Sequence, residues 1–141
     1  MNTYKGDIVK LKHKQVLVIT TNTQGRHGRG NALLGMKIGG AIYGRAKGPQ
    51  GRCYGIITKD LTKRIHPSIP KYFIIEQIGE LYEFAKKYWD LEFLIPYKGT
   101  GTNLNAYTPQ DMADMFSQFE IPDNIVFEEE FSKLLNGKNT K

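Results

Sequence analysis

The order of elements between residues 15 and 38 constrains this chain more than any other feature. Residues 15–21 form a continuous β-branched and apolar run bounded by polar residues, which is typical of a central strand covered on both faces. The glycine-rich sequence GRHGRG follows at residues 25–30, and residues 31–38 favour a helix. A strand, a glycine loop and a helix in this order predict an α/β domain with a ligand-binding loop at the carboxyl end of the strand.

Further strands and helices alternate along the chain. The other expected strands cover residues 7–11, 52–58, 91–97 and 125–127. The other expected helices run from residue 71 along an apolar stripe that reaches Trp89, from the N-cap Thr108 through Phe116, and from residue 128 to near Gly137. Residues 41–51 are expected to be irregular. This alternation predicts a three-layer α/β/α sandwich with a mixed, mostly parallel sheet, as a single domain over residues 1–137 with a frayed tail over residues 138–141.

Positive charge is concentrated in the glycine-rich half of the chain. Residues 1–70 carry 13 lysines and arginines against Asp7 and Asp60, a formal charge of +11. Residues 71–141 carry 7 against 12 acidic residues, a formal charge of −5. A cationic region around glycine loops suits an anionic partner, either a small phosphorylated molecule or a nucleic-acid backbone.

The composition argues against several classes of protein. No stretch is long and apolar enough to cross a bilayer, and the first residues lack the pattern of a secretory signal, so a cytoplasmic protein without a membrane partner is expected. The histidines are far apart in sequence and Cys53 is the lone cysteine, so no disulfide, metal site or cofactor is expected. Cys53 lies in an apolar run and is expected to be buried and inert.

Two polar loops follow predicted strands and are the places where chemistry is expected. The first is residues 25–30, and the second is residues 98–103, with the sequence KGTGTN. Glycines let backbone N–H groups approach a phosphate, and a helix N-terminus adds a favourable partial charge. No Gly-Lys-Ser/Thr closes the first loop, which excludes a Walker loop, and the spacing of its glycines fits the dinucleotide fingerprint poorly. The two loops therefore predict a cleft for a phosphate-bearing, nucleotide-like ligand.

Several residues are candidates for that site. The expected ligand-binding residues are Gly25, Arg26, Gly28, Arg29 and Gly30 in the first loop, and Gly99, Thr100, Gly101, Thr102 and Asn103 in the second. His27 is a candidate general acid or base, or a donor to a phosphate, and the neighbouring arginines favour its neutral form. Lys59 and Asp60 are candidates to activate water or to form a transient Schiff base with an opened ribose, although a surface ion pair explains them equally well. Tyr43 and Tyr107 are expected either to stack on a base or ribose or simply to pack.

Several segments of the chain resemble a known family. Residues 22–32, 40–44, 48–51 and 54–60, together with the Gly-Thr-Gly sequence at residues 99–101, are similar to small macro-like proteins of bacteria and phages. More loosely, the same order of strand, glycine loop, helix and second glycine loop looks like the macro domain, the module that binds ADP-ribose. The resemblance runs from about Val16 to Phe116 and implies a macro domain-like fold.

The resemblance also implies roles for individual residues. Asn22 and Asn31 would meet the distal ribose, the first loop would hold the diphosphate, and residues 99–103 would contact the diphosphate from the other side. Asn31 then joins His27, Lys59 and Asp60 as a candidate catalytic residue. Many macro domains hold the adenine through an acidic residue, for which Asp7 is a candidate.

Three functions remain open from the sequence. The first is binding of ADP-ribose or a related nucleotide, with possible hydrolysis of an ADP-ribosyl or phosphate-ester bond. The second is sequestration of a nucleotide signal, which needs the same pocket and no catalytic group. The third is a basic nucleic-acid-binding module, which the +11 half favours and the absence of an RNA-binding aromatic signature or helix-turn-helix disfavours.

Overall fold

Strands and helices alternate along most of the chain. The computed structural model describes residues 2–98, 100 and 105–135. The strands are β1 (Thr3–Tyr4), β2 (Gln15–Asn22), β3 (Gly48–Gln50), β4 (Cys53–Lys59), β5 (Glu92–Ile95) and β6 (Ile125–Glu128). The helices are α1 (Gly30–Gly39), α2 (Lys71–Lys87), α3 (Pro109–Phe116) and α4 (Glu129–Ser132). The predicted tail at residues 138–141 lies outside the described residues.

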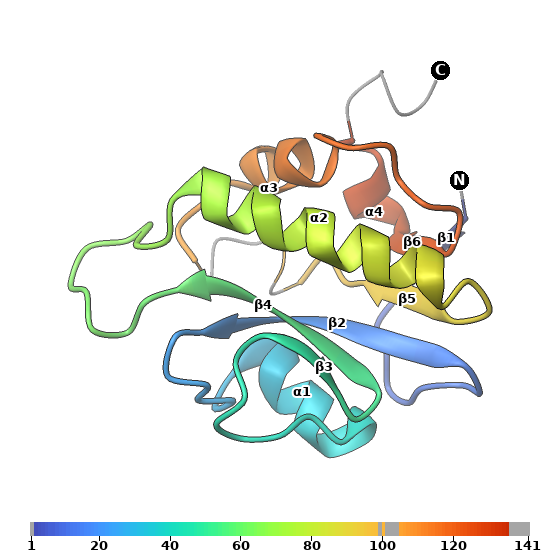
Figure 1. Cartoon of the computed structure of the whole chain (residues 1–141), viewed down its shortest axis with the longest axis horizontal. Helices are drawn as coiled ribbons and strands as arrows, with labels where there is room; N and C mark the ends of the chain where they lie inside the picture. Colours follow the sequence, from blue (N-terminus) through green and yellow to red (C-terminus); the bar gives the residue numbers. More distant parts are fainter. Residues whose placement is uncertain (1, 99, 101–104, 136–141) are drawn as a thin grey trace.

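The strands form one sheet with β2 near its centre (Figure 1). The order across the 6-stranded sheet is β1-β6-β5-β2-β4-β3. All neighbouring pairs are parallel except β3 and β4, which are antiparallel. This arrangement confirms the predicted mixed, mostly parallel sheet. The neighbours β2 and β4 are parallel, so their carboxyl ends lie at the same edge of the sheet.

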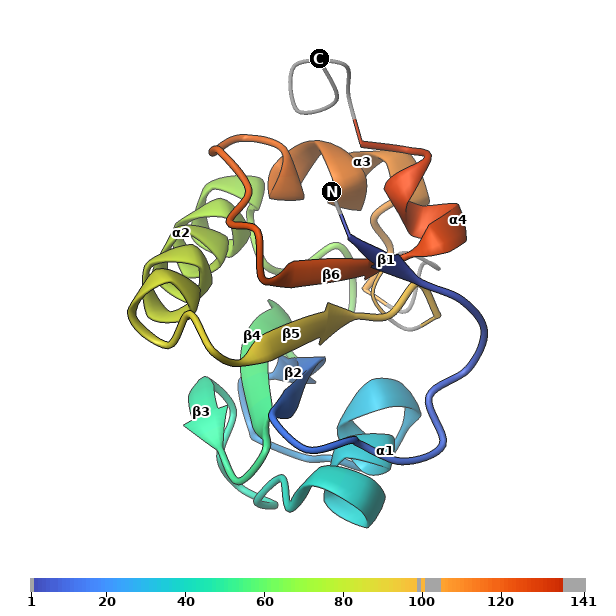
Figure 2. The ribbon, with the colours of Figure 1, turned by 90° about the vertical axis from the view of Figure 1, so that its right-hand side faces the viewer.

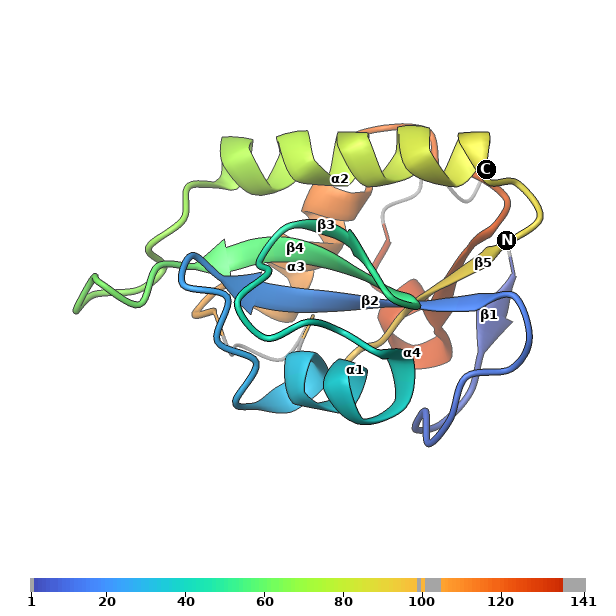
Figure 3. The ribbon, with the colours of Figure 1, turned by 60° about the horizontal axis from the view of Figure 1, so that its bottom comes forward.

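Helices cover both faces of the sheet. Helix α1 lies on one face, and α2 and α3 lie on the other (Figures 2 and 3). The strands alternate accordingly, because successive side chains of a strand point to opposite faces. In β2, for example, Leu17 and Ile19 pack in the cluster with Ala32 of α1, whereas Val18 packs in the cluster that contains α2 and α3. The predicted three-layer sandwich is therefore confirmed.

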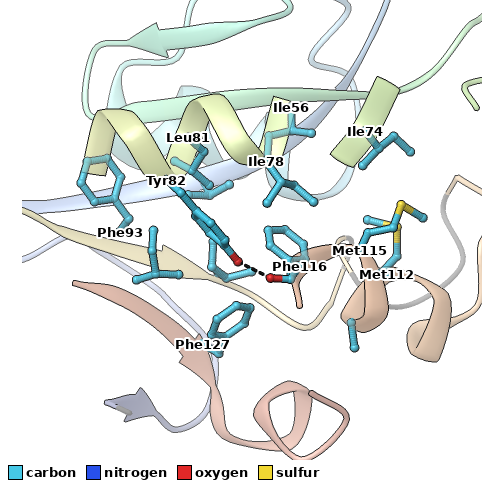
Figure 4. Packing of buried hydrophobic residues seen from close by; sticks show 14 of the residues in the cluster. Ile56, Ile74, Ile78, Leu81, Tyr82, Phe93, Met112, Met115, Phe116 and Phe127 are labelled. Atoms are coloured by element: carbon cyan, nitrogen blue, oxygen red, sulfur yellow. Dashed lines mark hydrogen bonds between the residues drawn. The ribbon is translucent and has the colours of Figure 1, made fainter. Parts of the chain in front are cut away.

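The larger of the two cores is built from aromatic and aliphatic side chains of α2, α3 and the sheet (Figure 4). Tyr82 of α2 is fully buried, and its hydroxyl donates a hydrogen bond of 2.5 Å to the carbonyl of Phe116 at the end of α3. Burial raises the pKa of Tyr82, so the hydroxyl stays protonated and able to donate. This bond joins the two helices within the apolar core.

Two predicted strand assignments near the sheet edges are wrong. Residues 7–11 are not a strand, because the short β1 pairs with β6 instead, while Leu11 is buried and Ile8 packs on the α1 side of the sheet. Residues 48–50, expected to be irregular, form β3. Pairing with β4 imposes that strand on a Gly-Pro-Gln sequence with little intrinsic strand preference.

Two helices are shorter than predicted. Helix α2 ends at Lys87, and Trp89, which the apolar stripe includes, is 78% exposed. The side-chain amide of Asn124 donates to the carbonyls of Ala85, Tyr88 and Leu91, which satisfies backbone acceptors at this helix end. Helix α4 covers only Glu129–Ser132 of the predicted terminal helix.

Cys53 is buried at the start of β4, as predicted. Burial raises the pKa of its thiol to about 11, which keeps the group protonated and unreactive at neutral pH. Among the helices that the structure describes, none is long and apolar enough to cross a membrane.

Candidate functional site

The first glycine loop leaves β2 through a turn that Asn22 closes. The side-chain oxygen of Asn22 accepts from the backbone N–H of Arg26 at 3.0 Å, and its amide donates to the Arg26 carbonyl at 2.8 Å. Both ends of the Asn22 side chain thus shape the loop. Asn22 also lines a cavity at the carboxyl ends of β2 and β4. The resemblance implies that Asn22 contacts the distal ribose of a ligand.

Gly25 brings this loop against the segment that follows α1. The N–H of Gly44 donates to the carbonyl of Gly25 at 2.7 Å, and Gly25 has a φ of +67°. A Cβ at this position would lie 2.4 Å from the carbonyl carbon of Gly44. Gly25 is therefore required by both its backbone conformation and the close approach of the two segments.

A cavity of about 420 Å³ opens at the carboxyl ends of β2 and β4, beside the N-terminus of α1. Its charged lining residues are Arg26, Arg29 and Lys59. The polar remainder of the lining includes Thr20, Thr21, Asn22 and Thr58. No carboxylate is among the described residues that line it. Three cations with hydroxyl and amide groups suit an anion that carries several oxygen atoms.

Lys59 and Asp60 are adjacent in sequence but have different environments. Lys59 is half-buried and lines the cavity, and no ion pair joins it to Asp60 or to any other described carboxylate. Asp60 Oδ1 accepts hydrogen bonds from the hydroxyl of Thr62 at 2.6 Å, from its N–H at 2.9 Å and from the hydroxyl of Thr23 at 3.2 Å. These bonds, the Thr62 hydroxyl foremost, hold the pKa of Asp60 below its usual value. Asp60 thus stabilises the turn after β4, while Lys59 faces the site.

His27 is buried beneath the first loop rather than open to the cavity. Its side chain is 1% exposed, its Nδ1 lies 2.8 Å from the carbonyl oxygen of Gly25, and its Nε2 lies 2.9 Å from Oε1 of Gln50 in β3. Both ring nitrogens therefore already have partners within the protein. This placement fits a residue that holds the loop better than one that exchanges protons with a substrate.

The second loop lies against the beginning of α1. The side-chain amide of Asn31, a buried residue, donates to the carbonyl of Lys98 at 2.7 Å and to the hydroxyl of Thr100 at 3.2 Å. Asn31 thereby joins the helix that follows the first loop to the second loop, although the two are 67 residues apart. The other predicted ligand-binding residues of the second loop, Gly99, Gly101, Thr102 and Asn103, lie outside the described residues.

A second cavity, of about 370 Å³, lies on the other side of the α1 N-terminus. Asn31 and Leu34 line this cavity, whereas Ala32 lines the first. The opposite wall comes from β1 and the segment after it, from the segment after β5, and from the junction of β6 and α4. Its side chains include Tyr4, Asp7, Ile8, Tyr97, Lys98, Glu128 and Glu130. Lys98 Nζ lies 3.4 Å from Asp7 Oδ1. Asp7, Asn31 and Lys98 of this lining could be found from the sequence, but Tyr4 and Tyr97 could not, because they come from segments far apart in the chain.

The two tyrosines considered for ligand stacking differ in exposure. Tyr43 is 60% exposed and lies beside His27, with ring centroids 6.2 Å apart. Tyr107 is buried, and its hydroxyl donates to the carbonyl of Ile69. Tyr107 is therefore part of the core, in agreement with the expectation that it packs rather than stacks on a ligand.

Among residues 2–98, 100 and 105–135, no three His, Cys, Asp or Glu side chains are grouped as the ligands of a metal ion would be.

Comparisons with known proteins place this geometry in a fold family. Neither protein-family models nor curated protein sequences give a match. A solved structure described as the macrodomain of Thermus aquaticus DarG is similar, with a TM-score of 0.52 and 19% sequence identity. The similarity covers 90% of this chain and 95% of that one. With the sheet order and the two helical layers, this likeness shows that the chain has a macro domain-like fold.

Proposed function

We propose that the protein binds ADP-ribose or a related phosphate-bearing nucleotide, with the diphosphate over the first glycine loop. The observation that carries this proposal is the first cavity, in which Arg26, Arg29 and Lys59 surround a glycine loop and a helix N-terminus without a described carboxylate. Backbone N–H groups at such a helix end and arginine side chains are both suited to phosphate oxygens. The macro domain-like fold supports ADP-ribose as the nucleotide, since that is the ligand which the resemblance implies.

The second cavity is the proposed place of the base. It adjoins the first cavity across the beginning of α1 and offers Tyr4, Ile8 and Tyr97 as apolar and aromatic walls. Asp7, Glu128 and Glu130 add carboxylates, and a carboxylate can accept a hydrogen bond from an exocyclic amine. A nucleotide with its base in the second cavity would cross the beginning of α1 and bring its phosphates to the first loop.

Calorimetry with ADP-ribose, NAD and ATP tests binding, with Arg29→Gln as the variant and Arg64→Gln as the matched control. Arg64 is an exposed arginine outside the lining of the first cavity. Loss of a hydrogen bond to a charged phosphate corresponds to about 1.5–3 kcal/mol, or roughly a 10- to 100-fold weaker affinity. We expect that loss in Arg29→Gln and wild-type affinity in Arg64→Gln. Equal binding by both variants, or no binding of any nucleotide, would contradict the proposal.

Cleavage of an ADP-ribosyl bond is the proposed second step, with Lys59 as the nucleophile. The unprotonated amine of Lys59 attacks the anomeric carbon, and the leaving group departs with the bonding electron pair and takes up a proton. Opening of the ribose ring gives a Schiff base, which water hydrolyses to release ADP-ribose and regenerate the amine. The other candidate catalytic residues then contribute by holding the loops in place, since each forms hydrogen bonds within the protein. They are His27, Asn31 and Asp60.

Product analysis with ADP-ribose 1″-phosphate and a mono-ADP-ribosylated peptide tests this step. Borohydride would reduce a Schiff base and leave a stable adduct on Lys59, detectable by mass spectrometry. We expect Lys59→Ala to bind ADP-ribose but to form neither product nor adduct. Tight binding by the wild type without any product would instead favour sequestration of a nucleotide.

A nucleic-acid-binding module is the second candidate function, and one observation favours it. The segment between β4 and α2 projects from the molecule beside the first cavity, with exposed Lys63 and Arg64 and with Ile65 83% exposed (Figure 1). Leu61 of the same segment lines the cavity. Affinity for single-stranded DNA or RNA that falls steeply with salt, in the absence of nucleotide binding, would favour this function over ADP-ribose binding.

A further inference from the structure

The hydrogen-bond partners of His27 limit the protonation states that suit its ring. The ring is buried, and both of its nitrogens face oxygen atoms. The carbonyl oxygen of Gly25, next to Nδ1, can only accept a hydrogen bond. The partner of Nε2 is a side-chain amide oxygen, so its identity depends on which way the amide of Gln50 points.

The amide of Gln50 has one orientation that satisfies its surroundings. Its Oε1 accepts from the backbone N–H of Ile42 at 2.9 Å, and its Nε2 donates to the carbonyl of Arg45 at 2.9 Å. A rotated amide would place a donor against the Ile42 N–H and an acceptor against the Arg45 carbonyl. Gly55 leaves room for this group, because a Cβ there would lie 3.1 Å from Nε2 of Gln50. The oxygen of Gln50 therefore faces His27.

Hydrogen bonds from both ring nitrogens to these two oxygen atoms are open only to the doubly protonated, positively charged ring. A neutral ring would point one nitrogen lone pair at an oxygen atom, at 2.8 or 2.9 Å. The charged ring differs from the sequence-based expectation of a neutral ring, which stays a prediction. The sequence shows the arginines around His27, whereas the acceptors that favour the charge come from the folded backbone and from β3.

The surroundings of His27 supply no negative charge in the free protein. Tyr43 is the titratable side chain from the 41–47 segment that lies beside the ring, Gln50 from β3 is neutral, and Arg26 and Arg29 lie in the same loop. No described carboxylate forms an ion pair with His27. An anion in the first cavity would supply that charge, because Arg26, Gly28 and Arg29, on either side of His27 in sequence, line it.

We propose that His27 is a proton-linked positioning residue: its doubly protonated ring holds the glycine loop in the anion-binding conformation, so that ligand binding takes up a proton. The loop is held at two points, Gly25 and β3, only when both ring nitrogens donate. The anion favours the charged ring, and by linkage the charged ring favours the anion. This inference rests on the proposed binding of a phosphate-bearing ligand in the first cavity.

The pH dependence of ADP-ribose binding tests the inference directly. The diphosphate of ADP-ribose has no group that titrates between about pH 6 and pH 8.5. Because the charged ring favours the anion, we expect affinity to fall as the pH rises from 6 to 8.5, by up to about tenfold per pH unit. Calorimetry at pH 7.5 in buffers of different ionisation enthalpy should show uptake of up to about one proton per ligand.

Two variants separate His27 from the other histidines. His27→Gln keeps an amide donor but cannot carry a charge, so its affinity should match the wild type at pH 8.5, fall below it at pH 6, and be independent of pH. His13→Asn, which changes an exposed histidine outside both cavities, should keep the wild-type pH profile. If His27→Gln fails to fold, ring ¹⁵N NMR of the ligand-bound wild type still tests the protonation of His27.

The outcomes distinguish this inference from the proposed function. In the bound protein, the His27 ring should show two protonated nitrogens. Binding without pH dependence or proton uptake, or a bound ring with a single N–H, would overturn the inference and leave nucleotide binding intact. Absence of ADP-ribose binding at every pH would overturn both.

Discussion

At the scale of single residues, two glycines of the same loop have different physical roles. Gly25 combines a φ of +67° with a Cβ position 2.4 Å from the carbonyl carbon of Gly44. Gly28 lines the first cavity, and an added Cβ there would meet no atom within 4 Å. Gly25 is therefore needed for the fold, whereas Gly28 is free to serve the approach of a ligand.

Alanine substitutions should separate these roles. Gly25→Ala should lower the free energy of unfolding by at least about 1–3 kcal/mol, because the backbone is strained and the Gly44 segment must move. Gly28→Ala should leave stability unchanged within about 0.5 kcal/mol and weaken ADP-ribose binding, since its methyl group occupies the space of a phosphate. Urea unfolding and calorimetry measure the two effects. A destabilised Gly28→Ala, or one that binds normally, would contradict this account of the loop.

At the scale of elements, helix α3 begins with a complete capping box. The hydroxyl of Thr108 accepts from the N–H of Asp111 at 3.0 Å, and Asp111 Oδ2 accepts from the N–H of Thr108 at 3.3 Å. These bonds, with Lys71 nearby, hold the pKa of Asp111 below its usual value. Because the folded pKa is depressed, the carboxylate contributes stability above the pKa of the unfolded chain, and this contribution is lost as the pH falls through the folded pKa.

Substitutions in this box should therefore act in a pH-dependent way. Thr108→Ala should lower the free energy of unfolding at pH 7 by about 1 kcal/mol. Asp111→Asn should also be less stable at pH 7, and the difference from the wild type should shrink as the pH falls below the pKa of an unfolded aspartate, about 3.9, and through the lower folded pKa. Denaturant unfolding at pH 7 and pH 3, with the exposed Asp123→Asn as control, measures this. A difference as large at pH 3 as at pH 7 would show that the charge of Asp111 is not what matters.

The sequence predicts elements well where the signal is local. β2, the glycine loop and α1 follow from a β-branched run, clustered glycines and helix-forming residues, and α3 follows from Thr108 and Pro109. β3 could not be predicted, because only its pairing with β4 makes residues 48–50 a strand. The apolar pattern also continues past the end of α2, where the distant Asn124 satisfies the last carbonyls.

The candidate site was predictable in part for the same reason. Arg26 and Arg29 follow β2, and Lys59 is the last residue of β4. Parallel pairing brings the carboxyl ends of these two strands together, and all three residues line the first cavity. The role of His27 depends on Gln50, which is 23 residues away, and the second cavity depends on the contact between Asn31 and Lys98. No periodicity or motif encodes such long-range contacts.

At the scale of the whole molecule, the uneven charge of the sequence becomes a spatial separation. The segments that form the first cavity come from the half with a charge of +11, whereas α2, α3 and α4 come from the half with a charge of −5. Charge attraction should therefore guide anions toward the loops rather than toward the helical face.

Ligand binding should stabilise the whole domain by mass action. ADP-ribose at a hundred times its dissociation constant should add about 2.7 kcal/mol to the free energy of unfolding and raise Tm, because only the folded chain holds the cavity together. Adenosine, which lacks the diphosphate, should raise Tm far less at the same concentration. Thermal unfolding with both ligands checks this, and equal stabilisation by adenosine would show that the base, and not the phosphate, provides the affinity.

The most direct test of the central claim is an NMR titration of the amide resonances with ADP-ribose. Binding of the diphosphate to the first loop predicts large shifts for the amides of residues 26–30 and of Lys59, which surround the first cavity. Residues on the opposite face, such as Glu83 of α2, should not shift. Saturable shifts of these amides, with the α2 face unchanged, would agree with the account, whereas unchanged loop amides at saturating ADP-ribose would contradict it.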